Sequence, residues 1–498
     1  MVPISRTDVL RRLRLDNPWW DTERRNAQTA AGLLQRRDYY AQFAGLVRNA
    51  AVRRAVILVG PRRVGKTVMV NQLVHELLAD GVDGREILYL SLDTPVYTEM
   101  TLDGVLALFQ DEHGHPPDAR LFVFFDEIQY HTDWERHLKS LVDTYPNVRF
   151  VATGSAAAAL RRQSRESGAG RFTDYLLPPL TFSEFLSFIG RDRMEGWEVW
   201  DRIAAATDGD RDGLVDPDWM QRLNADFVDY LNFGGYPEAV LNDEIRGDSA
   251  RFVRDDIVGK VLLRDLPSLY GIQDTQELNR LFAALAYNTG NEVSLVEIAE
   301  RTGVAKDKVT RYLSYLEAAF LVRRVLRVDD TARHLTRQRT FKVYLTNPSM
   351  RGALFGYVDA SDAALGHLAE TAVFSQFLHA PDSDMLRYAR WKHGRRDCEV
   401  DIVELDRATQ KPRSVTEVKW SDKPLRDPTL IEAAVELARK HGVAPVVTTR
   451  TVAGRRTLYD HTVWFVPTAL MAQVVGDITV DEALRDRAFG RFQPASRP

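Results

Sequence analysis

The segment GPRRVGKT, residues 60–67, constrains the fold of this chain more than any other stretch. It lies between an apolar run, AVILVG (55–60), and a stretch with helical periodicity, 65–79. Glycines let the backbone wrap around a phosphate, and the helix N-terminus directs N–H groups at it. The segment fits the phosphate-loop pattern and has the flanking strand and helix that this pattern requires. A glycine-bearing turn that binds no ligand is the structural alternative.

This loop predicts contacts to ATP and Mg²⁺. Lys66 would reach the β- and γ-phosphates, which also makes it a candidate catalytic residue. Thr67 would hold Mg²⁺ through its hydroxyl group. The predicted nucleotide-binding positions of the loop are Gly60, Pro61, Arg62, Arg63, Val64, Gly65, Lys66 and Thr67.

Two adjacent acids end another apolar run, LFVFFDEIQ (121–129). Asp126 would bind Mg²⁺ through the water shell of the ion, and Glu127 would polarise the attacking water. The alternative is that both carboxylates cap a helix expected to begin near Asp133. The phosphate loop some sixty residues earlier favours the catalytic interpretation.

Two further residues are candidates for the same site. The run VRFVATGS (148–155) ends where Thr153 or Ser155 could sense the γ-phosphate, although such residues also serve as helix caps. Arg171 follows a glycine-containing segment and could be a finger that completes a neighbouring subunit's site. A surface arginine near a turn is the alternative for Arg171.

The apolar runs predict an α/β fold. They are continuous rather than alternating and are separated by stretches of helical periodicity at 65–79, 101–111 and 133–144. This pattern indicates a parallel sheet covered on both faces. The expected divisions are an N-terminal helical segment (1–50), a P-loop core (51–190), a helical region (191–285), a winged-helix module (286–347) and a second α/β domain (348–498).

Several motifs carry a family resemblance. GPRRVGKT, DEIQ, ATGSAAAAL, GAGRF and LPPLTFSEFL occur in an order that resembles the prokaryotic AAA-type ATPases with a C-terminal domain of unknown function. The resemblance continues through YLNFGGYPEAV, KVLLRDLPSLYGI and GHLAETAVFSQF, and so covers nearly the whole chain. It implies an ASCE-type P-loop core with a helical lid, a winged helix-turn-helix and a C-terminal restriction-endonuclease-like domain similar to PD-(D/E)xK nucleases.

The segment 294–322 has the spacing of a helix-turn-helix, with a TGV turn between two amphipathic helices. Basic residues near the start of its second helix would meet DNA phosphates or base edges. A lid or packing module beside the ATPase core is the alternative. The basic residues that favour DNA are Lys306, Lys308 and Arg311, with Arg333, Arg337, Arg339 and Lys342 further along.

The C-terminal stretch CEVDIVELDRATQKPRSVTEVKW (398–420) contains an acid-apolar-lysine triplet. Strand periodicity places Glu417 and Lys419 on one face, and a hairpin connection brings Asp401 of the preceding strand near Glu417. In the nuclease fold that the resemblance implies, Glu370 on the upstream helix completes the set. Glu370, Asp401 and Glu417 would then bind Mg²⁺ through oxygen, and Lys419 would activate the hydrolytic water. An inactive copy of the fold that serves as an interaction platform is the alternative.

The neighbouring basic stretch RYARWKHGRR (387–396) predicts contacts to a phosphate backbone, with Tyr388 and Trp391 available to stack on bases. The net charge of −4 neither requires nor excludes nucleic acid. A single cysteine, Cys398, excludes an internal disulfide framework and a cysteine-rich zinc site. No run approaches the ~18 apolar residues of a membrane span, so we expect a cytoplasmic protein without membrane contact.

These features combine into one hypothesis with an alternative. The hypothesis is a DNA-associated ATPase whose P-loop motor regulates a Mg²⁺-dependent nuclease domain. The alternative is a nucleotide-dependent switch or scaffold that binds partner proteins and has an inert C-terminal domain. Assembly as a homo-oligomer is compatible with both.

Overall fold

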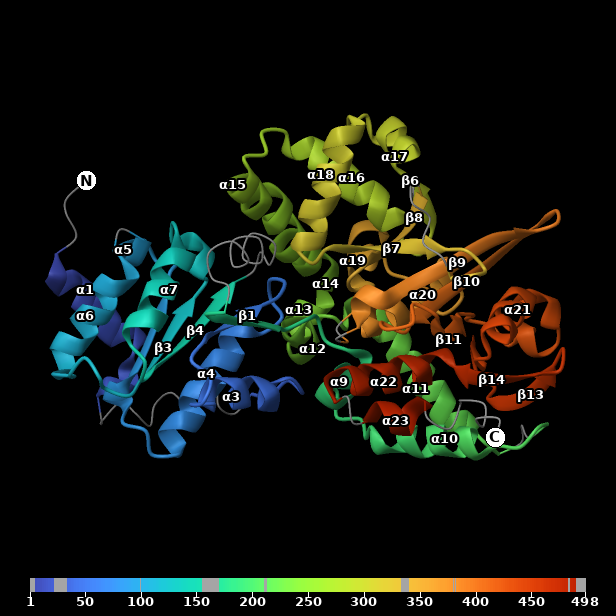
Figure 1. The fold of residues 1–498 in the computed structure, drawn as a ribbon, viewed down its shortest axis with the longest axis horizontal. Coiled ribbons are helices and arrows are strands. Elements are labelled where there is room, and N and C mark those ends of the chain that lie inside the picture. Colours follow the sequence, from blue (N-terminus) through green and yellow to red (C-terminus); the bar gives the residue numbers. More distant parts are fainter. Residues whose placement is uncertain are drawn as a thin grey trace. The chain divides into compact units, whose positions relative to one another are not determined.

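The computed structural model describes residues 5–21, 34–98, 100–154, 170–209, 213–332, 340–378, 380, 382–481 and 484–489. The chain separates into two compact units (Figure 1). The first comprises Met1–Pro178 with Ala318–Phe320, and the second comprises Pro179–Glu317 with Leu321–Pro498. The finer division into five parts stays a prediction.

A five-stranded parallel sheet forms the centre of the first unit within the described residues. Its order is β2-β3-β4-β1-β5, and every neighbouring pair is parallel. The α/β class with a parallel sheet is therefore confirmed. The strands are β1 (Ala55–Val59), β2 (Ile87–Ser91), β3 (Leu121–Asp126), β4 (Val148–Gly154) and β5 (Phe172–Leu176).

The edge strand β5 was not predicted from the sequence. Its five residues, FTDYL, are half-buried or exposed, whereas all five residues of β1 are buried. An edge strand covered less completely needs no continuous apolar run, so its sequence lacks the signal that marks the inner strands.

Helices surround this sheet, and the three predicted at 65–79, 101–111 and 133–144 are confirmed as α4, α6 and α7. The side chain of Thr101 caps α6 by accepting from the Gly104 N–H, and Gly114 ends the helix in the left-handed region at φ 68°. The elements are α1 (Arg6–Asp16), η1 (Pro18–Trp20), α3 (Tyr40–Arg48), α4 (Lys66–Ala79), η3 (Gly84–Glu86), α5 (Pro95–Thr98), α6 (Leu102–His113), η4 (Ile128–Tyr130) and α7 (Trp134–Thr144).

The segment after α1 covers the open edge of the sheet at β2. Asn17 accepts from the Tyr89 N–H at 2.6 Å and donates to the Tyr89 carbonyl at 2.7 Å. The indoles of Trp19 and Trp20 both donate to the Ile87 carbonyl. Side chains thus satisfy backbone groups that an exposed edge strand would leave unpaired.

The second unit is built on a nine-stranded mixed sheet within the described residues, in the order β13-β14-β12-β11-β10-β9-β7-β8-β6. Parallel pairing of β7 with β9 makes the strands after the helix-turn-helix continuous with the C-terminal strands. The strands are β6 (Glu292–Ser294), β7 (Val322–Val328), β8 (Thr340–Leu345), β9 (Leu386–His393), β10 (Arg396–Leu405), β11 (Pro412–Glu417), β12 (Pro445–Thr449), β13 (Gly454–Leu458) and β14 (His461–Pro467).

The helices α20 and α22 are buried along nearly their whole length in the main core of this unit. Helix α21 packs on a separate apolar cluster with β9, β10 and β11. The helical elements in chain order are α9 (Phe182–Phe188), α10 (Met194–Ala205), α11 (Pro217–Phe233), α12 (Pro237–Leu241), α13 (Asp243–Gly247), α14 (Ser249–Arg251), the π-helical η5 (Phe252–Gly259) and η6 (Val261–Asp265), α15 (Leu266–Tyr270), α16 (Thr275–Tyr287), α17 (Leu295–Thr302), α18 (Lys306–Ala318), α19 (Ser349–Phe355), α20 (Leu365–Phe377), η7 (Ser383–Met385), η8 (Lys423–Leu425), η9 (Pro428–Ile431), α21 (Glu432–His441), α22 (Thr468–Val480) and α23 (Leu484–Phe489).

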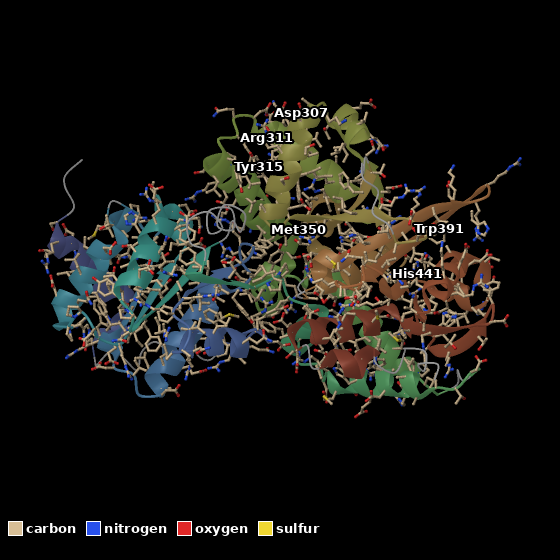
Figure 2. All side chains as sticks on the ribbon, viewed as in Figure 1. Asp307, Arg311, Tyr315, Met350, Trp391 and His441 are labelled. Atoms are coloured by element: carbon tan, nitrogen blue, oxygen red, sulfur yellow. The ribbon has the colours of Figure 1, made fainter. Side chains whose placement is uncertain are left out.

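The helices expected within 294–322 are present as α17 and α18, and Gly303 ends the first of them at φ 69°. Asp307, Arg311 and Tyr315 follow one another at four-residue intervals along one side of α18 (Figure 2). Among the described residues, no helix combines the length and the apolar character needed to cross a bilayer.

Candidate functional site

The predicted phosphate loop connects β1 to α4 as a tight backbone turn. A Cβ atom on Gly60 would lie 2.0 Å from the Leu177 carbonyl oxygen, so only glycine fits there. Gly65 caps α4 with φ 97°, a conformation that side chains rarely adopt. The backbone of the loop therefore requires glycine at both of these positions, whether or not a ligand is bound.

Lys66 lies across this loop. Its Nζ donates to the carbonyls of Gly60 and Pro61 at 3.0 and 2.8 Å, and only 5% of the residue is exposed. Two carbonyls of the loop thus hold the ammonium where the loop encloses it. A phosphate oxygen is a stronger acceptor for an ammonium than a carbonyl, because charge-assisted hydrogen bonds are the stronger ones.

Asp126 is the centre of a hydrogen-bond network at the ends of β2, β3 and β4. Its Oδ2 accepts from the hydroxyls of Thr67 at 2.8 Å and Tyr89 at 2.9 Å. Thr153 donates to the other carboxylate oxygen. Burial, followed by the charge of Asp126, raises the pKa of Tyr89, so the phenol stays a donor. Hydroxyl and carboxylate oxygens converge here, which is the donor set that Mg²⁺ prefers.

Glu127 adopts the left-handed region at φ 54°, which is rare for a residue other than glycine. Its N–H donates to the Thr153 hydroxyl at 3.0 Å, and Gln129 donates to its carboxylate. Thr153 thereby fixes both acids, although the sequence analysis assigned it to the γ-phosphate. With 1% of its surface exposed, Thr153 acts on the acids in this structure. Ser155, the other candidate, lies outside the described residues.

One buried arginine that the sequence analysis missed supports the loop. Arg37 donates to the Val64 carbonyl at 2.8 Å and to the Pro178 carbonyl at 3.0 Å, and it is 5% exposed. It precedes the loop by more than twenty residues, so motif spacing carries no signal for it. Only its position in the tertiary structure identifies it as a support for the backbone of the loop.

Arg171 lies at the opposite end of the sheet from the loop. Its carbonyl accepts from the Ala55 N–H at 2.9 Å, at the start of β1. The five residues of β1 place this point about 16 Å from the end that carries the loop. The guanidinium pairs with Asp143 on α7. Arg171 is therefore remote from the site of its own chain, and a role in a neighbouring subunit's site stays a prediction.

In the second unit, the four predicted residues of the C-terminal site come together. Asp401 on β10 accepts from the Val418 N–H at 3.0 Å. Lys419 Nζ lies 2.6 Å from Glu417 Oε1 and 3.8 Å from Asp401 Oδ2. Glu370 on α20 joins them through a shared partner, Lys342.

Lys342 on β8 occupies the middle of this carboxylate cluster, which we define as Glu370, Glu399, Asp401 and Glu417. Its Nζ lies 2.9 Å from Glu370, 2.8 Å from Glu399 and 3.0 Å from Asp401. Only 2% of the residue is exposed. The prediction that Lys342 belongs to a basic stretch that contacts DNA is wrong, because its side chain is buried against these carboxylates. Arg333, Arg337 and Arg339 lie outside the described residues.

Charges in the cluster perturb one another. Burial opposes ionisation of Lys342, but the neighbouring Tyr344 and the charges of Glu370 and Asp401 outweigh it and raise its pKa well above the ordinary value. Burial, then the charge of Asp401, raises the pKa of Glu370 to about 7 and that of Glu417 to about 8. The four carboxylates share two ammonium groups, those of Lys342 and Lys419, so a proton on one of the glutamates reduces the excess of negative charge.

This geometry does not fit a resident divalent ion with Lys342 in place. A hard cation would need the oxygens of Glu370 and Asp401 as direct ligands, and Lys342 already donates to both. No group of three or more histidine, cysteine, aspartate or glutamate side chains in the described part of the chain is arranged to hold a metal ion.

The basic stretch on β9 differs from the prediction. Tyr388 is fully buried and donates to Glu292 at 2.7 Å. Trp391, which Figure 2 labels, is 7% exposed and belongs to an apolar cluster. Neither ring is available to stack on bases. Arg390 pairs with Glu292, so its charge is already partly neutralised within the fold.

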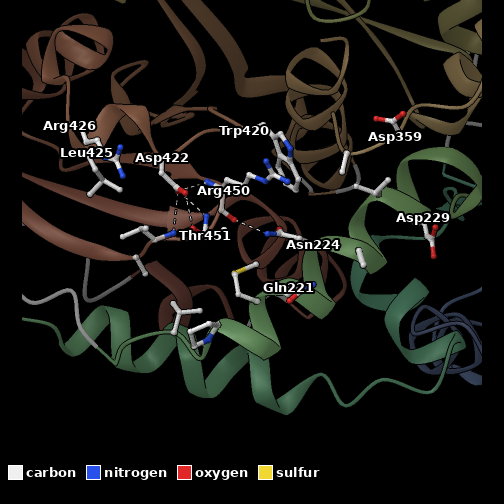
Figure 3. A pocket seen from close by; sticks show the side chains of 18 of the residues that line it. Gln221, Asn224, Asp229, Asp359, Trp420, Asp422, Leu425, Arg426, Arg450 and Thr451 are labelled. Atoms are coloured by element: carbon white, nitrogen blue, oxygen red, sulfur yellow. Dashed lines mark hydrogen bonds between the residues drawn. The ribbon is translucent and has the colours of Figure 1, made fainter. Parts of the chain in front are cut away.

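A separate pocket of about 1280 Å³ lies beside Trp420, between α11 and the loop after β12 (Figure 3). Asp422 accepts from the N–H groups of Arg450 and Thr451 at 3.0 and 2.9 Å, and Asn224 donates to the Arg450 carbonyl. These bonds fix the shape of the loop. Trp420 also lines a smaller pocket of about 470 Å³ at the carboxylate cluster.

Two segments of the chain match described families. Residues 52–186 match the AAA domain family, and residues 224–361 match a domain of unknown function. The chain therefore contains an AAA-type domain, as the sequence resemblance predicts. The second match begins within α11 and includes α17, α18 and the strands β6, β7 and β8.

Sequence similarity to individual proteins covers longer stretches of the chain than either family match. An uncharacterized protein of Haemophilus influenzae is 24% identical over 327 residues, which cover 65% of this chain and 74% of that protein. One from Methanocaldococcus jannaschii is 24% identical over 274 residues, or 54% of this chain and 56% of that protein. The solved structure of C. elegans PCH-2 aligns with a TM-score of 0.28 and 13% identity over 43% of this chain and 60% of that chain.

Proposed function

We propose that the first unit binds ATP and hydrolyses it with Mg²⁺. The observation that carries this proposal is the hydrogen bond of 2.8 Å between Thr67 and Asp126, beside a loop that encloses Lys66. It joins the two residues that would hold the ion at the point where the phosphates would lie. The match of residues 52–186 to the AAA domain family supports the proposal.

The residues of the proposed site have different roles in ATP binding and hydrolysis. Lys66 and the N–H groups at the start of α4 bind the phosphates and stabilise the charge that develops on them. Thr67 and Asp126 would hold Mg²⁺, which when bound neutralises charge on the phosphate oxygens. Glu127 orients the attacking water and accepts its proton, and Thr153 keeps both acids in position.

Replacement of Glu127 by glutamine tests this assignment. The variant keeps the shape of the side chain and loses the proton acceptor, so hydrolysis should fall by about 10²–10³-fold while ATP still binds. Binding of a fluorescent ATP analogue and release of phosphate separate the two effects. Unchanged phosphate release in the variant would refute the role of Glu127, and absent ATP binding by the wild-type protein would refute the site.

A second candidate function is DNA association by the second unit. The order α16, β6, α17, α18, β7, β8 supports the predicted winged helix, and Lys306 and Arg311 are exposed on α18. Lys308, the third predicted contact, instead pairs with Glu277 at 2.8 Å. Binding of duplex DNA across a salt series decides the question, because phosphate contacts make affinity fall steeply with salt. Replacement of Lys306 and Arg311 by alanine should weaken this binding, and an affinity unaffected by both salt and the substitutions argues against it.

For the carboxylate cluster, the geometry favours the switch or scaffold over the nuclease. A Mg²⁺-dependent nuclease needs the oxygens that Lys342 occupies. We therefore infer that ATP turnover controls the binding of partners by the second unit. The alternatives for the partner are DNA, a second copy of this chain and another protein. Cleavage of DNA by the wild-type protein with Mg²⁺ or Mn²⁺, lost on replacement of Asp401 by asparagine, would reinstate the nuclease.

A further inference from the structure

Lys342 reaches the carboxylate cluster from a different part of the chain. It lies on β8, where it pairs with Glu292 of β6 and Val325 of β7. Its partners come from α20 and β10, at sequence separations of 28 and 59 residues for Glu370 and Asp401. The strand after the helix-turn-helix thus supplies the cation for carboxylates of the C-terminal strands.

The ammonium is placed as a bound cation would be. It has three donor hydrogens, and three carboxylates lie 2.8–3.0 Å from its nitrogen. Mg²⁺ binds oxygen at about 2.0–2.1 Å, so the same carboxylates would have to move inward by only about 1 Å to hold an ion. Tyr344 donates to Glu370 at 2.6 Å and holds that carboxylate in place independently of Lys342.

A buried oxygen without a partner provides a second observation. Glu417 is 6% exposed, and its Oε2 has no hydrogen-bond partner among the described residues, while Oε1 accepts from Lys419. An unsatisfied buried acceptor is costly, and native proteins contain few of them. The cluster therefore offers more oxygen ligands than its two lysines satisfy, which is characteristic of a cation site.

The cluster is also accessible. Three of its members, Glu370, Glu399 and Asp401, line a pocket of about 470 Å³ together with Gly290, Asn291 and Lys419. The side chain of Glu399 is 37% exposed at the edge of the cluster. An ion could therefore reach the carboxylates through solvent once the ammonium is removed.

We propose that Lys342 is an internal cation that masks a divalent-cation site formed by Glu370, Glu399, Asp401 and Glu417. With Lys342 in place, the four carboxylates bind no divalent ion. Without it, they bind Mg²⁺ or Mn²⁺ through oxygen. This inference goes beyond ATP hydrolysis and is independent of it, because it concerns ion binding in the second unit alone.

Electron paramagnetic resonance of Mn²⁺, titrated into the nucleotide-free full-length protein, tests the inference. The Lys342→Met variant should gain one Mn²⁺ site per chain, and the affinity for that site should exceed any binding by the wild-type cluster by at least about tenfold. The added site should vanish in the double variant that also carries Asp401→Asn. Lys392→Met is the matched control, because Lys392 is 79% exposed on β9 and should leave Mn²⁺ binding unchanged.

The wild-type protein provides a test that does not depend on the folding of a variant at Lys342. Its Mn²⁺ stoichiometry should be the same with and without Asp401→Asn, and a site lost in Asp401→Asn but kept in Asp126→Asn would overturn the proposal. Thermal unfolding adds a second measurement, since Mn²⁺ should raise the Tm of Lys342→Met and not that of the wild type. A folded Lys342→Met protein without a new site would also overturn it.

Discussion

The two buried lysines of this protein, Lys66 and Lys342, differ in their partners more than in their burial. Lys66 donates to two neutral carbonyls and is 5% exposed, whereas Lys342 contacts three carboxylates and is 2% exposed. A phosphate oxygen would be a stronger acceptor for Lys66 than these carbonyls. Carboxylates neutralise Lys342 and make it part of the structure. Lys66 therefore lies where we propose that phosphate binds, whereas Lys342 occupies the position that we propose a divalent cation would take.

Among substitutions at the two lysines, replacement of Lys342 should have the largest effect on stability. Its replacement by alanine leaves buried carboxylates uncompensated, which should destabilise the second unit by about 3–5 kcal/mol at neutral pH. Hydrogen exchange of amides in α20 and β10 measures the loss. Lys392→Ala, which removes an exposed lysine 3.9 Å from Asp397, should cost less than about 1 kcal/mol. Equal exchange in the wild type and the Lys342 variant would contradict the structural role.

At Lys66, the effect should appear in activity rather than in stability. Lys66→Ala should lower ATP hydrolysis by about 10²–10³-fold, because it removes a preorganised charge at the phosphates. Release of phosphate measures it, and Lys139→Ala on α7, the other lysine among residues 1–178, is the control. If Lys66→Ala hydrolyses ATP at the wild-type rate, the loop is not the nucleotide site.

Arg37 supports the loop that encloses Lys66, and its replacement tests whether this support matters for ATP binding. Arg37→Ala removes the two hydrogen bonds that its buried guanidinium donates to the carbonyls of the loop region. We therefore expect a destabilisation of the first unit by about 2–3 kcal/mol and weaker ATP binding. Denaturant unfolding and binding of a fluorescent ATP analogue measure these changes. Arg36→Ala is the matched control, since Arg36 is exposed and pairs with Glu76. Equal effects of the two substitutions would show that Arg37 has no special role.

The comparison also predicts a pH dependence that is confined to the second unit. Burial and the charge of Asp401 raise the pKa of Glu417 to about 8 and that of Glu370 to about 7, from an ordinary value of 4.5. The folded state then holds protons that the unfolded state has lost, so stability should fall as pH rises from about 5 to 8. The slope is at most about 1.4 kcal/mol per pH unit for each glutamate.

Glu417→Gln should flatten this dependence, because the amide resembles the protonated acid at every pH. The pKa of Asp401 is lowered, since the charges of Lys342 and Lys419 outweigh its burial, so it contributes only in more acidic solution. Hydrogen exchange of β11 amides between pH 5 and 8 measures the slope. A stability that rises with pH in this range would contradict the assignment.

Much of the first site was predictable because its residues lie in two short motifs, the loop at 60–67 and the acids at the end of β3. The eight loop residues and the acids at the end of β3 are set by local spacing, and the structure places Thr67 and Asp126 in contact. Arg37, Tyr89 and Thr153 acquire their roles only where the ends of strands and loops meet. Sequence spacing carries no information about such contacts.

The second site was predictable only in part. Strand periodicity placed Glu417 and Lys419 together, and the hairpin brought Asp401 to them. Lys342 looked like one more basic residue in a solvent-facing stretch, since a two-residue period does not say which face of a strand is buried.

By itself, therefore, the sequence determined the AAA-type domain, the parallel sheet and part of the membership of both candidate sites. Only the tertiary structure decided what each site holds. Lys66 lies beside the glycines of its own loop, so local geometry positions it, but Lys342 meets Glu370 and Asp401 because β7 and β9 pair and make one sheet of distant strands. Pairing between strands depends on the whole fold, and so does the charge that fills the carboxylate cluster.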